Sequence, residues 1–512
     1  MGIPLYQGHD DSTTRIEDLS TSGRRALQKL LSLSQIYAIG SVLQQSVGFF
    51  LIPLYTRALG TAGYGTLEIV SSFAAISMVL FNLGLSSAIV KCYHQDCASK
   101  AEQRAIFSTS LFLLLPPLVA GCTLIFLLAP WLSSQLLVSA EMRNLLQISA
   151  FSVFLVSVSS IFLALFRAKQ DAWTYAALSL CQFFSLTFLN IYFVAVREMG
   201  VRGILWATVL SHGLVILLAL PKLWGEITLR FEKSLARPLL TFGLYVIPMG
   251  LAGWIMNLSD RYFLRFLWDL DEVGVYSLGY KFGTAIFVLV VWPFQLAWPS
   301  FSFSISRNHN HRQVYARVLT YLLVILVFVS LSVALLCQPL IRLMADEQFR
   351  HSYRIVPPVA LGYIFYGIVY CVAPGVHLKM KTQFLSLFVV LSAVVNILLN
   401  FLFVPEFGMM GAAWATAITY LLLAVSTFVF SNRVYPISYE YSRLAKIFIS
   451  GLFFFYMGLL VQPDSVPIMM AWYLLIVFAF PFSLLFAGIL EPDEKTVLTQ
   501  VLSRMGLWQP HS

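Results

Sequence analysis

The chain has 512 residues, of which 59% are hydrophobic and only 11% are charged. A soluble globular chain carries about 25% charged residues, and no soluble fold hides so much apolar surface. The composition therefore predicts an integral membrane protein and excludes a cytosolic enzyme, a secreted disulfide scaffold and a disordered chain. The net charge of +9 is typical of basic loops on the cytoplasmic face of a membrane, and we expect no nucleic-acid partner.

Residues 1–33 are polar, and we expect no cleavable signal peptide among them. We expect a cytoplasmic tail, in which residues 20–33 form an amphipathic helix on the membrane surface. Its leucines would face the lipid, and its basic residues would reach anionic headgroups. A disordered tail is the alternative for residues 1–18.

Fourteen mostly apolar runs follow, each close to the ~20 residues that a spanning helix needs. With a cytoplasmic N-terminus, 23 of the 33 Lys and Arg residues fall on the cytoplasmic side, nine fall opposite, and Lys281 lies inside a span. The positive-inside rule therefore predicts that both termini are cytoplasmic. The predicted spans are 34–56, 66–90, 105–129, 146–166, 174–196, 203–223, 239–259, 273–298, 318–338, 355–376, 383–404, 410–431, 444–461 and 468–488.

One motif occurs twice, at the start of the sixth and of the twelfth predicted span. Residues 200–208 read GVRGILWAT and residues 408–416 read GMMGAAWAT, so both contain Gly-x-x-Gly-x-x-Trp-Ala-Thr. A weaker echo relates GYGTL at 63–67 to GVYSL at 274–278. A displacement of six spans, an even number, gives the two copies the same orientation in the membrane.

The repeat predicts an all-α membrane protein of about 14 transmembrane helices. Two parallel six-helix lobes with a pocket between them describe an alternating-access transporter. The predicted parts are the tail at 1–33, an N-lobe at 34–225, a C-lobe at 238–431, two more spans at 444–488 and a cytoplasmic C-terminal tail at 489–512.

Residues 49–73, FFLIPLYTRALGTAGYGTLEIVSSF, resemble the opening of bacterial polysaccharide-unit flippases of the Wzx type. The sequence Asp-Arg-Tyr-Phe-Leu at 260–264 is similar to the Asp-Arg-x-x-Leu that follows their seventh span, and the repeated Trp-Ala-Thr motif also fits. The resemblance covers residues 34–431. These flippases belong to the multidrug/oligosaccharidyl-lipid/polysaccharide (MOP) exporter superfamily.

The resemblance implies a protein of the bacterial inner membrane that moves undecaprenyl-pyrophosphate-linked oligosaccharides from the inner to the outer leaflet. Its partners would be this glycan, membrane lipids, a polysaccharide polymerase and other assembly proteins. We expect no catalytic residue, metal or cofactor, and coupling to H⁺ or Na⁺ stays open.

Lys281 is the main candidate for substrate binding. A charged residue inside a span costs ~2.5–3.5 kcal/mol on insertion scales, so it normally faces a cavity or a partner. We expect Lys281 to face the cavity and contact the pyrophosphate. The alternatives are that it pairs with an acid such as Glu68, or that it snorkels to the interface.

Further candidates lie at the predicted outer ends of the first two spans and of the seventh. Glu68 is expected to pair with Arg57 or to take a proton, and otherwise is a rim residue. Arg57 in one lobe and Asp260 and Arg261 in the other occupy equivalent places. They are expected to form an outer gate or a pyrophosphate site, and the alternative is that they are ordinary interfacial anchors.

The remaining candidates are amides within spans and basic residues at cytoplasmic ends. The amides Asn257, Asn396 and Asn400 either bind sugar hydroxyls or join helices, and joining helices is the commoner role. Basic residues that either gather the anionic headgroup or only satisfy the positive-inside rule are Lys91, Arg167 and Lys169.

Other functions stay open. An ion-coupled drug or metabolite exporter would share the two lobes, and a flippase for the cell-wall lipid precursor would share the fourteen-helix plan. A membrane glycan polymerase or ligase is disfavoured because no long loop is present. The Asp-Leu-Asp at 269–271 matches a glycosyltransferase motif, but it lies in a predicted outer loop, away from cytosolic sugar nucleotides.

Overall fold

The computed structural model describes residues 47–95, 99–136, 142–226, 228, 230–307, 309–486 and 488. Among these residues the regular structure is helical throughout, with no β-strand. The predicted all-α class is therefore confirmed. The predicted surface helix and both predicted tails lie outside the described residues, as do residues 34–46 of the first predicted span.

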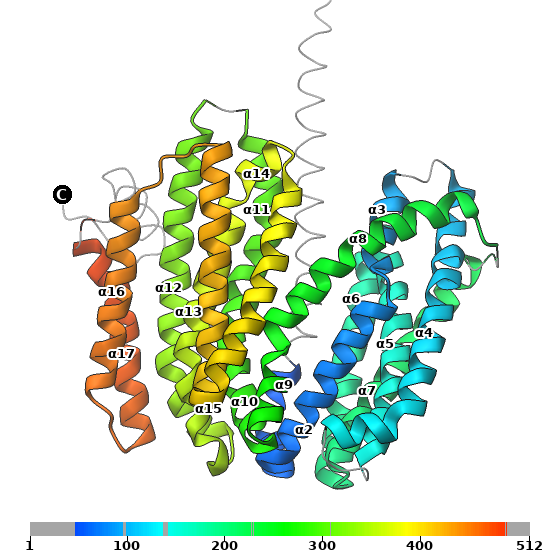
Figure 1. Cartoon of the computed structure of the whole chain (residues 1–512), viewed down its shortest axis with the longest axis horizontal. Coiled ribbons are helices and arrows are strands. Elements are labelled where there is room, and N and C mark those ends of the chain that lie inside the picture. Colours follow the sequence, from blue (N-terminus) through cyan, green and yellow to red (C-terminus); the bar gives the residue numbers. More distant parts are fainter. Residues whose placement is uncertain are drawn as a thin grey trace, which may run out of the picture.

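Two groups of helices stand side by side and meet at the lower end in Figure 1. We call them the N-lobe and the C-lobe. The N-lobe contains α2 (Ile52–Phe81), α3 (Leu85–Gln95), α4 (Lys100–Leu136), α5 (Arg143–Ala168), α6 (Ala172–Asn190), η2 (Ile191–Val196), α7 (Gly200–Leu223) and η3 (Trp224–Glu226). From α8 (Lys233–Leu258) the chain passes through α9 (Asp260–Leu267) into the C-lobe.

The C-lobe carries the remaining helices, of which the last two pack on its outer side (Figure 1). It contains α10 (Leu270–Ile286), η4 (Phe287–Val291), α11 (Trp292–Ile305), α12 (His311–Met344), η5 (Glu347–Ile355), α13 (Val356–Val372), α14 (Pro374–Leu378), α15 (Thr382–Val434), α16 (Tyr441–Leu460) and α17 (Val466–Phe486).

Twelve helices among the described residues are long and apolar enough to cross a membrane. This number is lower than the fourteen predicted spans because two of the helical stretches each contain residues of two predicted spans. The stretch Ile52–Gln95 contains the end of the first predicted span and the whole second one, and Thr382–Val434 contains the eleventh and the twelfth. The other ten each correspond to one predicted span.

Helix α15 is a hairpin that turns at Gly408. This residue has a φ of 53° and ψ of −132°, a conformation that glycine adopts without steric cost. The Nδ2 of Asn396 donates to Oγ1 of Thr419 over 3.2 Å, although 23 residues of straight helix would separate them by ~35 Å. A methyl group at Gly411 would overlap the carbonyl oxygen of Phe403, so the second glycine lets the two arms pack closely.

The first copy of the motif has the same structural role. Gly200 has a φ of 57° and begins α7. A methyl group at Gly203 would lie 2.9 Å from Cβ of Phe193 on the preceding arm. The repeated Gly-x-x-Gly thus makes a tight helical hairpin in each lobe, which gives the sequence repeat a physical cause.

A third turn, at Gly60, folds the chain back at the start of the N-lobe. Gly60 has a φ of 65°. A Cβ on Gly48 would lie 3.5 Å from Nζ of Lys281, and the hydroxyl of Tyr64 lies 2.9 Å from the same nitrogen. A straight helix would separate Gly48 and Tyr64 by ~24 Å, so the residues before and after Gly60 lie side by side.

Helix α8 contacts both lobes. Near its start, a methyl group at Gly243 would overlap the carbonyl oxygen of Leu83, at the break between α2 and α3. Further along, the indole nitrogen of Trp254 donates to the carbonyl of Ser72 over 2.9 Å. Its last turn brings Asn257 to the tyrosines of the C-lobe. Because α9 follows directly after α8, its residues lie at the junction between the lobes.

Candidate functional site

A cavity of about 550 Å³ lies between the lobes, and three of the predicted charged residues line it. The N-lobe side contributes Glu68, Phe49 and Phe50, and α8, α9, α10, η4 and α13 contribute the rest. The lining residues are Phe49, Phe50, Glu68, Asn257, Leu258, Arg261, Ser277, Tyr280, Lys281, Thr284, Ala285, Val288, Leu289 and Tyr363.

Lys281 faces this cavity and contacts the N-lobe. Its Nζ donates to the hydroxyl of Tyr64 over 2.9 Å and lies 3.7 Å from a carboxylate oxygen of Glu68. The side chain keeps 27% of its surface exposed. The prediction that it faces the cavity and the alternative that it pairs with Glu68 are thus both correct. An ammonium group with exposed surface beside a single shared carboxylate is free to accept another anion.

Arg261 and Asp260 form a buried pair beside Lys281. The guanidinium Nη1 of Arg261 donates to the carboxylate of Asp260 over 2.9 Å and to the carbonyl of Asn257 over 2.8 Å. Its Nε lies 3.5 Å from Glu68, and Asp260 also accepts a short hydrogen bond from Tyr276. Two cations and two carboxylates therefore meet here, with Glu68 from the N-lobe shared between the two cations of the C-lobe.

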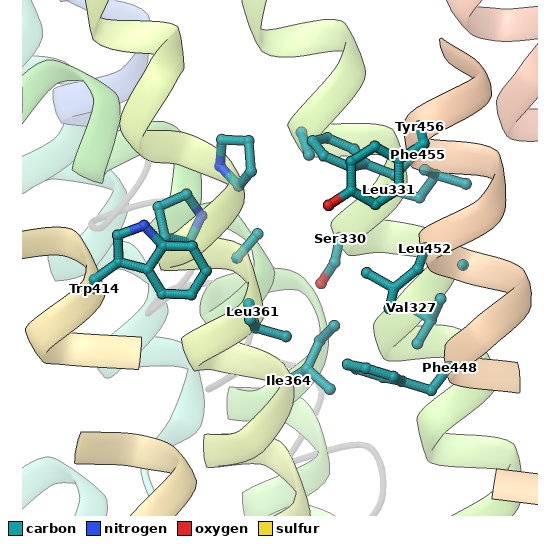
Figure 2. Close-up of a pocket in the computed structure, with 15 residues that line it drawn as sticks. Val327, Ser330, Leu331, Leu361, Ile364, Trp414, Phe448, Leu452, Phe455 and Tyr456 are labelled. Atoms are coloured by element: carbon teal, nitrogen blue, oxygen red, sulfur yellow. The ribbon is translucent and has the colours of Figure 1, made fainter. Parts of the chain in front are cut away.

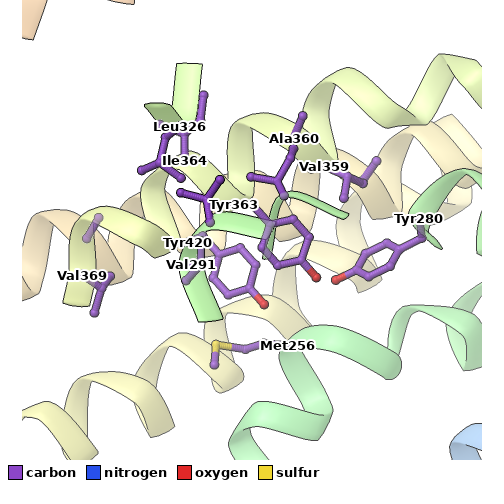
Figure 3. Packing of buried hydrophobic residues seen from close by; sticks show 14 of the residues in the cluster. Met256, Tyr280, Val291, Leu326, Val359, Ala360, Tyr363, Ile364, Val369 and Tyr420 are labelled. Carbon is purple, nitrogen blue, oxygen red and sulfur yellow. The ribbon is translucent and has the colours of Figure 1, made fainter. Parts of the chain in front are cut away.

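A second wall of the cavity is polar but uncharged. Three tyrosine hydroxyls converge on Oδ1 of Asn257, which accepts from Tyr420 over 2.8 Å, from Tyr280 over 3.4 Å and from Tyr363 over 3.5 Å. Figure 3 shows these rings among the buried aliphatic side chains of the C-lobe, with their hydroxyls turned toward one another. Amides, hydroxyls and aromatic faces are groups that can bind a sugar.

Arg57 does not pair with Glu68, which corrects one of the predicted contacts. It is exposed and lines a separate hollow with Glu198 and Gly200. Glu68 instead pairs with the C-lobe cations, because the turn at Gly60 directs α2 toward α10. The predicted equivalence of Arg57 and Arg261 also fails in burial, since Arg261 is only 4% exposed.

Asn396 and Asn400 lie away from the cavity. They are 1% and 0% exposed. Asn400 donates to the side-chain oxygen of Asn396 over 3.1 Å, and Asn396 donates to Thr419 on the other arm of the hairpin. They join the arms of α15, as the alternative of helix contacts predicts, and neither of them lines the cavity.

The predicted cytoplasmic cations have different surroundings. Lys169 pairs with Glu226 at 2.6 Å, the Nζ of Lys91 lies 4.9 Å from the ring centre of Phe242, and Arg167 is exposed at the end of α5. Lys91 and Lys169 each have a local contact, and a role in gathering a headgroup stays a prediction.

The Asp-x-Asp motif has a structural explanation. Asp269 caps the start of α10 by accepting from the backbone nitrogen of Glu272 over 2.8 Å, and Asp271 accepts a short hydrogen bond from Thr61. Among the described residues, no group of three or more His, Cys, Asp or Glu is placed to hold a metal ion.

A smaller hollow of about 190 Å³ lies within the C-lobe, between α16 and helices α12, α13 and α15. Figure 2 shows Trp414 on one side of it and Leu452 and Phe448 on the other, with Ser330 between them. Its lining residues include no charged side chain. It therefore has no group for an anionic headgroup, and the cavity around Lys281 is the candidate site.

A match to a family model identifies the protein family of this chain. Residues 34–304 match the family described as "Polysaccharide biosynthesis protein", which is more than half of the chain. The chain belongs to this family. A relative from Haemophilus influenzae, "Lsg locus putative protein 1", is 22% identical over 280 residues, or 51% of this chain. The chain spans 63% of that relative's length.

Solved structures show the same fold. "Lipid II flippase MurJ, inward closed conformation" has a TM-score of 0.69 at 17% identity, with 88% of this chain and 98% of that chain covered. An inward-facing multidrug resistance MATE family transporter of the MOP superfamily has a TM-score of 0.62 at 16% identity, with 78% and 96% covered. At these identities the likeness shows the fold, and the predicted two-lobed transporter architecture agrees with it.

Sequence reasoning missed the tyrosines of the site. Tyr64, Tyr280, Tyr363 and Tyr420 all contact candidate residues, but a tyrosine in an apolar run equally often marks a membrane interface. Tyr64 carried one usable signal, because it lies in the GYGTL stretch that echoes GVYSL of the other lobe. Its pairing with Lys281 required knowledge of which helices cross.

Proposed function

We propose that the protein moves undecaprenyl-pyrophosphate-linked oligosaccharides from the inner to the outer leaflet of the bacterial inner membrane. The lobes would alternate in opening the cavity to each side, with both termini cytoplasmic. The main support is that Lys281, a partly exposed cation, lines a cavity between two lobes in a chain of the polysaccharide biosynthesis family.

The charges of the cavity support an anionic substrate. A pyrophosphate group would replace Glu68 as the partner of Lys281, since that pair is separated by 3.7 Å and is longer than a good charge-assisted hydrogen bond. Arg261 would keep Asp260 and act as a fixed positive neighbour. The polar wall around Asn257 would contact sugar hydroxyls, and the lipid tail would remain in the membrane.

Glu68 also suggests how transport is driven. Protonation of Glu68, or Na⁺ at its carboxylate, would free Lys281 for the substrate, so an H⁺ or Na⁺ gradient is the proposed energy source. The proposal assigns no catalytic step to the chain. A polymerase that uses the flipped units would act after it.

A deletion strain with glycan synthesis intact tests the proposal. Its lipids are extracted, and the leaflet that holds the pyrophosphate-linked oligosaccharide is probed. Complete units trapped in the inner leaflet, with surface polymer lost, are expected. Units that reach the outer leaflet unpolymerised would point to a polymerase or ligase.

The same strain separates the alternatives that share this fold. Accumulated cell-wall precursor would favour the function named for the lipid II flippase of similar fold. Unchanged lipids with altered drug resistance would favour an exporter like the multidrug transporters of similar fold. Re-supply of the gene must restore the surface polymer in the predicted case.

A further inference from the structure

Helix α2 of the N-lobe crosses α10 of the C-lobe in close contact, at the lower end in Figure 1. A methyl group at Gly65 would overlap the carbonyl oxygen of Leu270, and one at Gly274 would overlap the carbonyl oxygen of Thr61. The contact is reciprocal, because each glycine receives the backbone of the other lobe. Two backbones pack this closely only where both helices lack a side chain.

Polar contacts surround this glycine crossing. Thr61 donates to Asp271 in a short hydrogen bond and lies 3.4 Å from Oε1 of Gln348. The backbone nitrogen of Asp346 donates to Thr56 over 3.4 Å. Every one of these contacts joins the first hairpin of the N-lobe to the C-lobe, and Thr61 is only 8% exposed.

The crossing is directly connected to the charged site. Tyr64, which precedes Gly65, accepts from Lys281, whose Nζ also lies 5.3 Å from the centre of the tyrosine ring. On the other side, Tyr276 lies two residues after Gly274 and donates to Asp260, the partner of Arg261. Both tyrosines are 0% exposed. Separation of the helices would therefore pull Tyr64 away from Lys281.

We propose that the Gly65–Gly274 crossing is the gate that closes one end of the cavity, and that Tyr64 is the positioning residue that couples this gate to Lys281. The inference rests on the proposed transport function. With the predicted cytoplasmic N-terminus, the end that this gate closes is the outer one. When the gate is closed, Tyr64 and Glu68 both contact the ammonium group of Lys281. An anion that binds Lys281 competes with these contacts and so destabilises the closed gate.

A cysteine at Thr61 measures the gate directly. In a version of the protein without native cysteines, Thr61→Cys is labelled with a thiol reagent in detergent, where both ends are accessible. Gly65→Ala should raise the labelling rate about tenfold or more, because an extra methyl forced into a packed contact prevents its closure. The matched control is Gly253→Ala, since nothing lies within 4 Å of a methyl group at Gly253. Equal rates in folded Gly65→Ala and control protein would overturn the gate.

Tyr64→Phe tests the coupling, because it removes one hydroxyl and keeps the ring. In the Thr61→Cys protein, inorganic pyrophosphate should increase labelling several-fold, whereas sulfate at equal ionic strength should not. With Tyr64→Phe the basal rate should rise and the pyrophosphate effect should shrink. A purely structural role of Tyr64 would change the basal rate alone and leave the pyrophosphate response intact, which would overturn the coupling.

A reversible lock covers the case in which Gly65→Ala does not fold. Thr61→Cys with Asp271→Cys places two thiols where the native side chains touch. An oxidant should form a disulfide that stops transport, and a reductant should restore it. Transport that continues with the disulfide formed would overturn the gate. The effect of Gly65→Ala on labelling needs no substrate, so a wrong substrate would leave that result unchanged while the deletion strain failed.

Discussion

Two groups of polar side chains lie within the helices, and they differ in their surroundings. Lys281 faces a cavity with a partly exposed side chain and a shared carboxylate. Asn396 and Asn400 are fully buried and bonded to each other and to the facing arm. Both groups cost free energy to insert in a membrane. Lys281 keeps exposed surface for a ligand. The amides are enclosed between two helix arms that they join, and the Oδ1 of Asn400 has no hydrogen-bond partner among the described residues.

The largest effect on stability is expected at Asp260. Replacement by Ala leaves Arg261 buried with only Glu68, at 3.5 Å, as a charged neighbour, and loss of one partner of a buried pair costs about 3–5 kcal/mol. Asp260→Ala should lower the unfolding temperature of the purified protein far more than Glu226→Ala, which breaks a half-buried pair. Equal shifts would mean that Arg261 finds another partner.

Lys281→Ala should mainly affect transport. Hydrogen bonds to charged groups contribute about 1.5–3 kcal/mol, so we expect a loss of roughly 10- to 100-fold in flipping rate at low substrate. The unfolding temperature should change little, because the side chain is partly exposed. Lys281→Arg should recover part of the rate. The control Lys100→Ala removes an exposed lysine outside the cavity and should change neither transport nor stability. Equal effects of the two substitutions on transport would contradict a special role of the cavity lysine.

The opposite pattern is expected for the amide pair. Asn396→Leu removes the bond to Thr419 and should cost about 0.5–1.5 kcal/mol of unfolding free energy. Transport per folded molecule should stay the same, as measured by flipping rate divided by the amount of folded protein. A selective loss of transport would place this pair in the substrate path.

The smallest effect is expected at Lys169. Its pair with Glu226 lies near the surface, with side-chain exposures of 24% and 20%, and such pairs contribute about 0–1 kcal/mol. Lys169→Ala should leave both stability and transport nearly unchanged. A large loss of transport at low ionic strength, relieved by salt, would instead support a headgroup-gathering role.

Much of the fold could be predicted because lipid imposes simple rules on a sequence. Apolar runs of the right length identified the helices, and the repeated Gly-x-x-Gly marked the two hairpins at Gly200 and Gly408. The sequence did not show that α2 and α15 each join two predicted spans, since glycines in the left-handed conformation cannot be told from ordinary helix glycines without coordinates.

The site could be predicted only in part. Lys281 was identifiable because a lysine inside a span is costly, and Asp260 and Arg261 stood out as adjacent charges. The pairing of Glu68 with the C-lobe depends on the crossing angle of α2 and α10, which no local pattern reveals. The amides of α15 were misplaced because polar residues look the same in sequence whether they face a cavity or another helix.

Reconstitution into liposomes tests the central claim most directly. Purified protein is incorporated with undecaprenyl-pyrophosphate-linked oligosaccharide, an ion gradient is applied, and the glycan that appears in the outer leaflet is measured with a lectin or a membrane-impermeant enzyme. The wild-type protein and Lys100→Ala should accelerate flipping well above protein-free liposomes, and Lys281→Ala should not. Flipping by Lys281→Ala at the wild-type rate, or none by the wild-type protein with any such glycan, would contradict the account.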